Sequence, residues 1–170
     1  MQQLDPKAVW LFFIKFILGR FIYIIFFIIY GLFALSNILS NLNKSTPSFE
    51  LFKWLWIIIP ALFIFFWIWA KLTYHFYWYE LREDGFRKEL GVIWKKYATI
   101  PYNRIQNVDI YRGVIDRILG LSDLHIQTAG ASGLITTEGR LPGLSREVAE
   151  QLRDELIRRA QQSRTTNQGL

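Results

Sequence analysis

The 170-residue sequence contains no cysteine and only two histidines, His75 and His125. Without cysteine, the chain cannot form a disulfide, supply a thiol nucleophile or hold zinc or an iron–sulfur cluster through thiolates. Two histidines are also too few for a histidine-based metal cluster. These absences remove thiol enzymes and cysteine-ligated metal sites from consideration, although carboxylates could still bind a hard cation. We predict no metal and no cofactor.

Charged side chains are missing from two long stretches in the first part of the chain. Residues 21–43 carry no charge, and residues 54–70 read WLWIIIPALFIFFWIWA. A helix of about 20 apolar residues crosses the hydrocarbon core of a bilayer. We therefore predict that residues 1–71 form a membrane anchor with transmembrane helices at about 16–39 and 54–73, the second kinked by Pro60.

A secretory signal peptide is the alternative interpretation of the first apolar stretch, because Ala34-Leu35-Ser36 resembles a cleavage site. Such a leader would be unusually long, and its n-region would be strongly apolar. We therefore favour a membrane-spanning anchor over a cleaved leader.

Basic residues indicate how the anchor is oriented. They precede the first predicted span and follow the second, whereas the polar loop between the spans, residues 40–53, contains only Lys44 and Lys53. The positive-inside rule then predicts that both termini lie in the cytoplasm, on the inner side of the plasma or inner membrane.

Residues 72–160 have the pattern of a small antiparallel β domain that ends in one helix. We expect the first three strands in YHFYWYELRE, FRKEL and VIWKKYATI. A later strand alternates Asn107, Asp109 and Tyr111 with apolar residues. Ser145 precedes a helix with an apolar stripe, REVAEQLRDELIRRA, and the polar tail 161–170 is predicted to be disordered.

The stretch from Tyr97 to Ala131 carries the most informative motifs. Val114–Leu119 predicts one short helix, and Gly120 is expected in the left-handed conformation that ends it. The elements IPY-x-RIQ-x-V, DR-x-LGL and TAG make residues 72–160 resemble the membrane-anchored bacterial pleckstrin-homology (PH) domain family, the YdbS-like proteins. The motif positions to which we assign structural roles are Pro101, Asp116, Arg117, Gly120, Thr128 and Gly130.

This resemblance implies a membrane α-helical hairpin plus a PH-like antiparallel β-sandwich or barrel capped by a C-terminal helix. It implies no reaction, since the family is mostly non-catalytic. Ser122, Asp123 and His125 are the residue types of a hydrolase triad, but neighbouring residues on a strand point to opposite faces. The glycine-rich stretch Gly130–Gly133 lacks the following helix that a phosphate-binding loop needs, so a hairpin loop is the simpler interpretation.

Two sets of polar residues are candidate binding sites. Arg104, Gln106 and Asn107 are predicted to form a strand edge that binds a partner, although Arg104 could equally pair with Asp109 or Asp116. The second set is predicted to contact lipid headgroups and comprises Lys71, Arg87, Lys88, Lys95 and Lys96.

The acids Glu83 and Asp84 occupy the loop in which eukaryotic PH domains carry a basic phosphoinositide site. This departure argues against phosphoinositide recognition, and a solvated charged strand is an equal interpretation of the lysines.

We predict a non-enzymatic interaction module that binds another membrane protein or a second copy of itself beside membrane lipids. An accessory subunit of a larger membrane complex is one form that such a module can take. Binding of anionic lipid or of a membrane-active peptide, in envelope stress resistance, is the alternative. Residues 71–170 contain fifteen Lys or Arg and twelve Asp or Glu, a balance of only +3 with interspersed signs. No nucleic-acid partner is predicted, because nucleic-acid binding needs a clustered basic surface.

The predicted topology can be tested with reporters fused at residue 170. The cationic flanks lie at the terminal ends of the two spans, and the loop between the spans is poor in basic residues. A cytoplasm-specific reporter should therefore be active and a periplasm-specific reporter inactive. Activity of the periplasmic reporter at that position would contradict the two-span topology.

Overall fold

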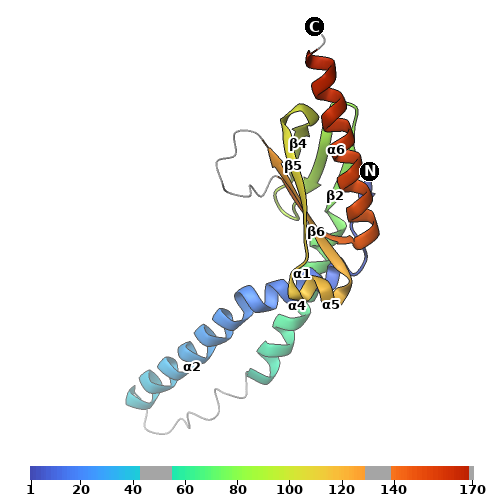
Figure 1. The fold of residues 1–170 in the computed structure, drawn as a ribbon. Helices are drawn as coiled ribbons and strands as arrows, with labels where there is room; N and C mark the ends of the chain where they lie inside the picture. The colour runs from blue at the N-terminus through green and yellow to red at the C-terminus, as the bar shows by residue number, and fades with distance from the viewer. Residues whose placement is uncertain (43–54, 129–138, 169–170) are drawn as a thin grey trace. The chain divides into compact units, whose positions relative to one another are not determined.

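The computed structural model describes residues 1–42, 55–128 and 139–168 (Figure 1). Its contacts divide the chain into two compact units, Phe12–Lys71 and a second unit that joins Met1–Leu11 to Leu72–Leu170. The sequence analysis assigned residues 1–71 to the anchor, whereas here the segment Met1–Leu11 packs with the β domain. Gly130 lies outside the described residues, and so does most of the predicted loop 40–53.

The unit Phe12–Lys71 is built from apolar helices. α1 spans Ala8–Phe16, a π-helical segment spans Ile17–Phe21, α2 spans Ile22–Leu42, and α4 spans Leu55–His75 with Pro60 inside it. Among the described residues, Trp56–His75 is long and apolar enough to cross a membrane. The helical segments Ala8–Arg20 and Ile22–Ile38 meet the same criterion only as a bent pair.

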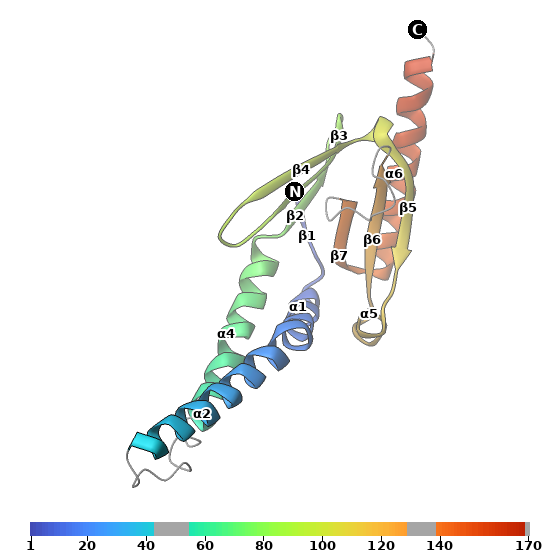
Figure 2. The same ribbon diagram turned by 90° about the vertical axis from the view of Figure 1, so that its left-hand side faces the viewer.

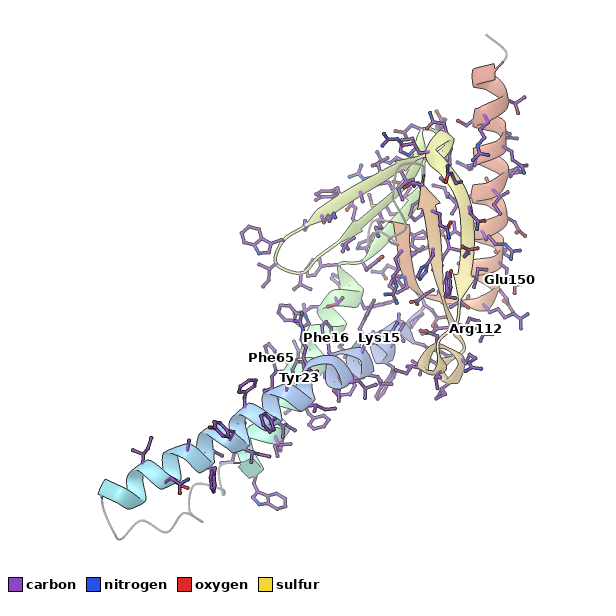
Figure 3. All side chains as sticks on the ribbon, turned by 60° about the vertical axis from the view of Figure 1, so that its left-hand side comes forward. Lys15, Phe16, Tyr23, Phe65, Arg112 and Glu150 are labelled. Atoms are coloured by element: carbon purple, nitrogen blue, oxygen red, sulfur yellow. The ribbon has the colours of Figure 1, made fainter. Side chains whose placement is uncertain are left out.

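Large apolar side chains cover the outside of these helices. Tyr23 and Phe65 point away from the helix axes (Figure 3), and Phe26, Phe27 and Ile64 are similarly exposed. A water-soluble unit would bury such residues, but a lipid-facing surface requires them. On the inner side, the Phe13 ring lies 5.2 Å from that of Trp67, edge to face, so α1 and α4 make a direct aromatic contact.

The β domain contains two antiparallel sheets (Figure 2). The first has the strand order β1-β2-β3-β4, formed by Gln2–Gln3, Trp78–Leu81, Gly85–Leu90 and Lys96–Pro101. The second has the order β5-β6-β7, formed by Ile105–Tyr111, Leu121–Thr128 and Arg140–Ser145. A 3-10 turn, Tyr102–Arg104, leads from β4 to β5, and the short helix α5, Val114–Leu119, leads from β5 to β6.

The final helix, α6, spans Arg146–Gln168 and runs along the second sheet (Figure 1). Its buried stripe is Ala149, Leu152, Leu156 and Ala160, spaced by three and four residues. Ser145 caps the first turn, since its Oγ accepts a hydrogen bond from the Val148 N–H at 3.3 Å. Mixed α/β structure with antiparallel sheets and a C-terminal helix is consistent with a PH domain.

The sequence placed several boundaries differently. α4 continues as a helix to His75, so that β2 begins only at Trp78. β4 begins at Lys96, because Gly91–Lys95 forms the turn after β3. α6 extends to Gln168 through the tail predicted to be disordered, where Arg164 donates a hydrogen bond to the Ile105 carbonyl and ties this part to β5.

The N-terminal segment completes the β domain. Gln2 and Gln3 pair with Tyr79 and Trp78 as strand β1. Beyond them Leu4, Ala8 and Leu11 are buried, and the Asp5 N–H donates to the Gly143 carbonyl of β7 at 3.1 Å. The Asp5 side chain accepts a hydrogen bond from the Lys7 N–H at 2.9 Å, as expected of a residue that caps a helix start.

Gly143 makes this packing possible. Gly143 and Gly120 share the same left-handed φ of 72°. A Cβ atom on Gly143 would lie 2.6 Å from the Ala8 Cβ, whereas one on Gly120 would meet nothing within 4 Å. Gly120 therefore needs glycine only for its backbone conformation, while Gly143 needs it for the conformation and for the approach of α1.

The two glycines make a matched pair for a stability test. Gly120→Ala should cost about 1 kcal/mol, because an alanine is strained in the left-handed region. Gly143→Ala should cost clearly more, because its methyl group also displaces Ala8. We expect a larger fall in the Tm of the full-length protein in detergent for Gly143→Ala, and partial recovery when Ala8→Gly is added. Equal Tm losses for the two alanine variants would contradict the packing of the N-terminal segment against β7.

Candidate interaction surfaces

The outer edge of β5 is the first candidate surface. Among the described residues β5 pairs on one side only, with β6. Ile105 and Val108 are buried beneath it, while Gln106 and Asn107 are exposed. An edge strand presents backbone N–H and C=O groups that another strand can pair with.

The three residues predicted to form this edge occupy different local structures. Arg104 is exposed but ends the 3-10 turn before β5. Gln106 lies at a register shift, because Ile105 pairs with Thr128 and Asn107 pairs with Gln127. Such a bulge interrupts the ladder and protects an edge from pairing. Asn107 alone belongs to the regular part of the strand, so the usable edge runs from Asn107 to Tyr111.

Polar side chains form an ordered row on this regular part. The Asp109 carboxylate accepts hydrogen bonds from Asn107 Nδ2 at 3.0 Å and from Gln127 Nε2 at 2.7 Å. These amides, rather than Arg104, are its hydrogen-bond partners. The exposed Tyr111 ring lies 4.5 Å from the His125 ring, between centroids, and continues the row. The row combines an acid, two amides and an aromatic ring, a composition suited to protein binding.

Helix α5 is held by a hydrogen bond at each end. The Asp116 Oδ2 accepts a hydrogen bond from the Gly113 N–H at 3.0 Å, which holds the first turn. Gly120 closes the last turn at φ 72° and ψ 21°, with its N–H bonded to the Arg117 carbonyl at 3.2 Å. Thr128 and Pro101 end strands β6 and β4.

The five residues predicted to contact lipid are separated by the fold. Lys88 is only 1% exposed, and its Nζ donates to the Arg140 carbonyl at 2.8 Å, so it does not reach a headgroup. Phe86 and Lys88 are two positions apart and are both buried, so they lie on the same inward face of β3, a period-two relation that can be read from the sequence. Arg87 pairs with Glu89 at 2.7 Å.

The remaining lipid candidates are exposed lysines. Lys71 ends the helical unit and lies over the Trp67 ring, 5.8 Å from its centroid. Lys95 and Lys96 lie at the turn between β3 and β4. Of the five lipid candidates, Lys95 and Lys96 are the two that are adjacent in the chain and exposed on the β domain.

With this geometry in place, comparison with known proteins identifies the chain. The profile of a family described as bacterial PH domain matches residues 13–160. The chain belongs to the bacterial PH domain family. This confirms the resemblance found in the motifs between Ile100 and Gly130.

One curated relative supports the membrane association of this PH domain protein. The UPF0699 transmembrane protein YdbT of Bacillus subtilis (strain 168) is 30% identical over 108 residues, which cover 64% of this chain and 22% of the relative. The chain therefore spans about a fifth of the length of that relative. No solved structure matches. The chain is thus a membrane-associated protein with a bacterial PH domain.

The turn between β2 and β3 of this PH domain carries acids and is held by α6. The Arg82 carbonyl accepts hydrogen bonds from the Tyr102 hydroxyl at 2.7 Å and from Arg159 at 2.9 Å. Hydrogen bonds from Arg158 and Arg159 lower the pKa of Glu155 to about 2, so that its carboxylate stays charged. Arg158 and Arg159 line the same cavity as Glu83 and Asp84, so acidic and basic side chains are mixed at this turn.

A buried polar cluster, which the sequence analysis did not find, joins the two sheets of the PH domain. The Arg140 carbonyl accepts from Lys88 Nζ at 2.8 Å and from the Tyr77 hydroxyl at 3.1 Å. The Arg140 guanidinium pairs with the buried Asp123, whose other oxygen accepts from the Gly143 N–H at 3.3 Å. Asp123 therefore belongs to this cluster. Within the described ranges, no group of three acidic or histidine side chains could hold a metal ion.

The Tyr77 hydroxyl allows this cluster to be tested by pH. Burial raises the pKa of Tyr77 above its ordinary value of 10.0, although the Arg140 guanidinium opposes the shift. A phenol whose pKa is raised on folding contributes stability fully below pH 10, and this contribution falls as the pH rises above 10.

We therefore expect Tyr77→Phe to destabilise the protein by about 1 kcal/mol at neutral pH, because it removes one buried hydrogen bond. The deficit should shrink above pH 10, where only the parent protein loses this contribution. Thermal midpoints of the two proteins at several pH values provide the measurement. A deficit that stays constant or grows at alkaline pH would contradict the assignment.

Proposed function

We propose that this chain is a two-span inner-membrane protein whose cytoplasmic PH domain is a non-enzymatic module that binds another protein chain through the edge of β5. The helical hairpin holds the domain beside the inner leaflet. The domain itself, a β-sandwich closed by α6, supplies the binding edge.

The observation that carries this proposal is the regular part of β5, from Asn107 to Tyr111. It is an edge among the described residues, and its side chains are arranged in a row held by Asp109. An extended segment can add to such an edge as a further strand, with main-chain hydrogen bonds for affinity and alternate side chains for specificity. The bulge at Gln106 and the contact from Arg164 to the Ile105 carbonyl limit this addition to the part beyond them.

The charge of the row favours a protein over a lipid at this edge. Asp109 lies at its centre, and a carboxylate repels an anionic bilayer surface. Amide and tyrosine side chains are well suited to protein interfaces, where they bond backbone groups and bury aromatic surface.

The proposed module catalyses no reaction. Asp123, the acid closest in sequence to Ser122 and His125, is occupied by Arg140 and by the Gly143 N–H. A hydrolase would need that acid to orient the histidine. Purified protein that turned over a lipid or peptide would overturn this part.

The binding edge is tested by co-purification of the full-length protein from membranes in mild detergent. Asn107→Ala combined with Tyr111→Ala removes both ends of the polar row while leaving the buried side of β5 unchanged. If the edge binds a partner, recovery of that partner should fall by about tenfold or more, since truncation of a tyrosine that is an interface hot spot costs about 2 kcal/mol or more. Arg146→Ala, an exposed position on α6, is the control and should leave recovery unchanged.

Self-association is distinguished by crosslinking. The chain has no cysteine, so Asn107→Cys introduces a single thiol at the edge. Crosslinked dimers formed in membranes by Asn107→Cys, but not by Asp154→Cys on α6, would identify a second copy as the partner. Unchanged recovery of every co-purifying protein in the double variant, with no crosslink at residue 107, would contradict the proposed function.

A further inference from the structure

The turn between β3 and β4 exposes large apolar side chains. Ile93 is 69% exposed and Trp94 is 86% exposed. Both lie in the turn Gly91–Lys95, outside the regular strands and far in sequence from the β5 edge. In Figure 2 the β3–β4 hairpin projects from the rest of its domain. Exposed tryptophan and isoleucine side by side are costly in water and indicate a surface that meets an apolar phase.

The backbone of the turn has a defined shape. Gly91 has a φ of 117°, and a Cβ atom there would lie 1.9 Å from the Trp94 carbonyl oxygen. Only glycine fits such a close approach. The chain therefore folds back tightly at Gly91, which directs the residues between Gly91 and Lys95 outward and keeps them from joining β4.

The base of the turn lies beside the point where the chain enters the β domain from α4. Lys95 Nζ lies 5.9 Å from the centre of the Phe76 ring. The Phe76 N–H donates to the Leu72 carbonyl at 3.0 Å and so continues the α4 helix past Lys71. A helix advances about 1.5 Å per residue, so the path along the chain from Lys71 to Phe76 is about 7.5 Å. The base of the turn therefore contacts the residue that directly follows α4 in the chain.

Two basic residues follow the apolar tip directly. Lys95 and Lys96 are both exposed. Tryptophan is enriched at the interface between headgroups and acyl chains, and lysines beside it are attracted to anionic headgroups. The exposed Ile93 and Trp94, the basic residues after them and the contact with the residue that follows α4 together match one ligand, the bilayer surface.

We propose that the turn Gly91–Lys96 is a membrane-docking site: Ile93 and Trp94 insert into the headgroup region of the bilayer, and Lys95 and Lys96 bind anionic lipid headgroups. This contact gives the PH domain a second attachment besides α4 and restricts its rotation on the membrane. The site is separate from the β5 edge and does not depend on what binds there.

The insertion is tested with the full-length protein reconstituted into vesicles that contain phosphatidylglycerol and phosphatidylcholine. Because the chain has no cysteine, Ile93→Cys accepts a single environment-sensitive fluorophore. Asp154→Cys, exposed on α6, is the matched control. We expect lipids with a nitroxide near the headgroup to quench the label at residue 93 and aqueous iodide to quench it poorly, with the reverse at residue 154. Equal iodide quenching at the two positions would overturn the proposal.

The roles of the side chains are tested in the same labelled protein. Trp94→Ser should reduce nitroxide quenching at residue 93 by about twofold or more, and Trp94→Phe should preserve it, because an aromatic ring suffices for interfacial insertion. Lys95→Glu with Lys96→Glu should reduce quenching in vesicles with phosphatidylglycerol, and the reduction should be much smaller in pure phosphatidylcholine. Quenching unaffected by all of these changes would overturn the assignment, whatever the outcome at the β5 edge.

Discussion

The arrangement of the two sheets in the PH domain depends on hydrogen bonds to the backbone carbonyl of Arg140. It accepts hydrogen bonds from Lys88 of the first sheet and from Tyr77, while its own strand belongs to the second sheet. A buried ammonium is costly unless it is hydrogen-bonded. The need to satisfy Lys88 therefore selects one arrangement of the two sheets, and the pairing of the Arg140 guanidinium with Asp123 reinforces it.

The same strand also receives the N-terminal segment. Asp123 bonds the Gly143 N–H, and the Gly143 carbonyl bonds the Asp5 N–H, so one chain of polar contacts runs from β6 through β7 to the start of the protein. Ala8 then packs where a side chain at residue 143 would lie. The β domain consequently uses residues from two separate segments of the chain, Met1–Leu11 and Leu72–Leu170.

The folded β domain has two exposed surfaces that differ in their chemistry. The β5 edge presents amides, an acid and tyrosine, whereas the β3–β4 turn presents tryptophan and isoleucine followed by lysines. A polar edge suits a protein strand, and a basic apolar tip suits a bilayer. A membrane-held domain with both can contact lipid through one surface and leave the other available to a partner.

Local sequence determined the elements whose ends are set by neighbouring residues. Val114–Leu119, the left-handed Gly120 and the capping Ser145 follow from turn and cap chemistry within a few residues, and the apolar helices follow from hydrophobic length. The family, too, could be recognised from short motifs.

Only the tertiary structure decided which long-range partners each residue has. Lys88 resembles a surface lysine in sequence, yet β3 turns it inward onto a carbonyl 52 residues away. Met1–Leu11 resembles the start of a membrane helix, yet Leu4, Ala8 and Leu11 are buried, and Ala8 and Leu11 pack where a side chain at residue 143 would lie. Trp94 resembles a strand residue, yet the close turn at Gly91 excludes it from β4 and exposes it. Burial depends on contacts between distant segments, which periodicity along one segment does not encode.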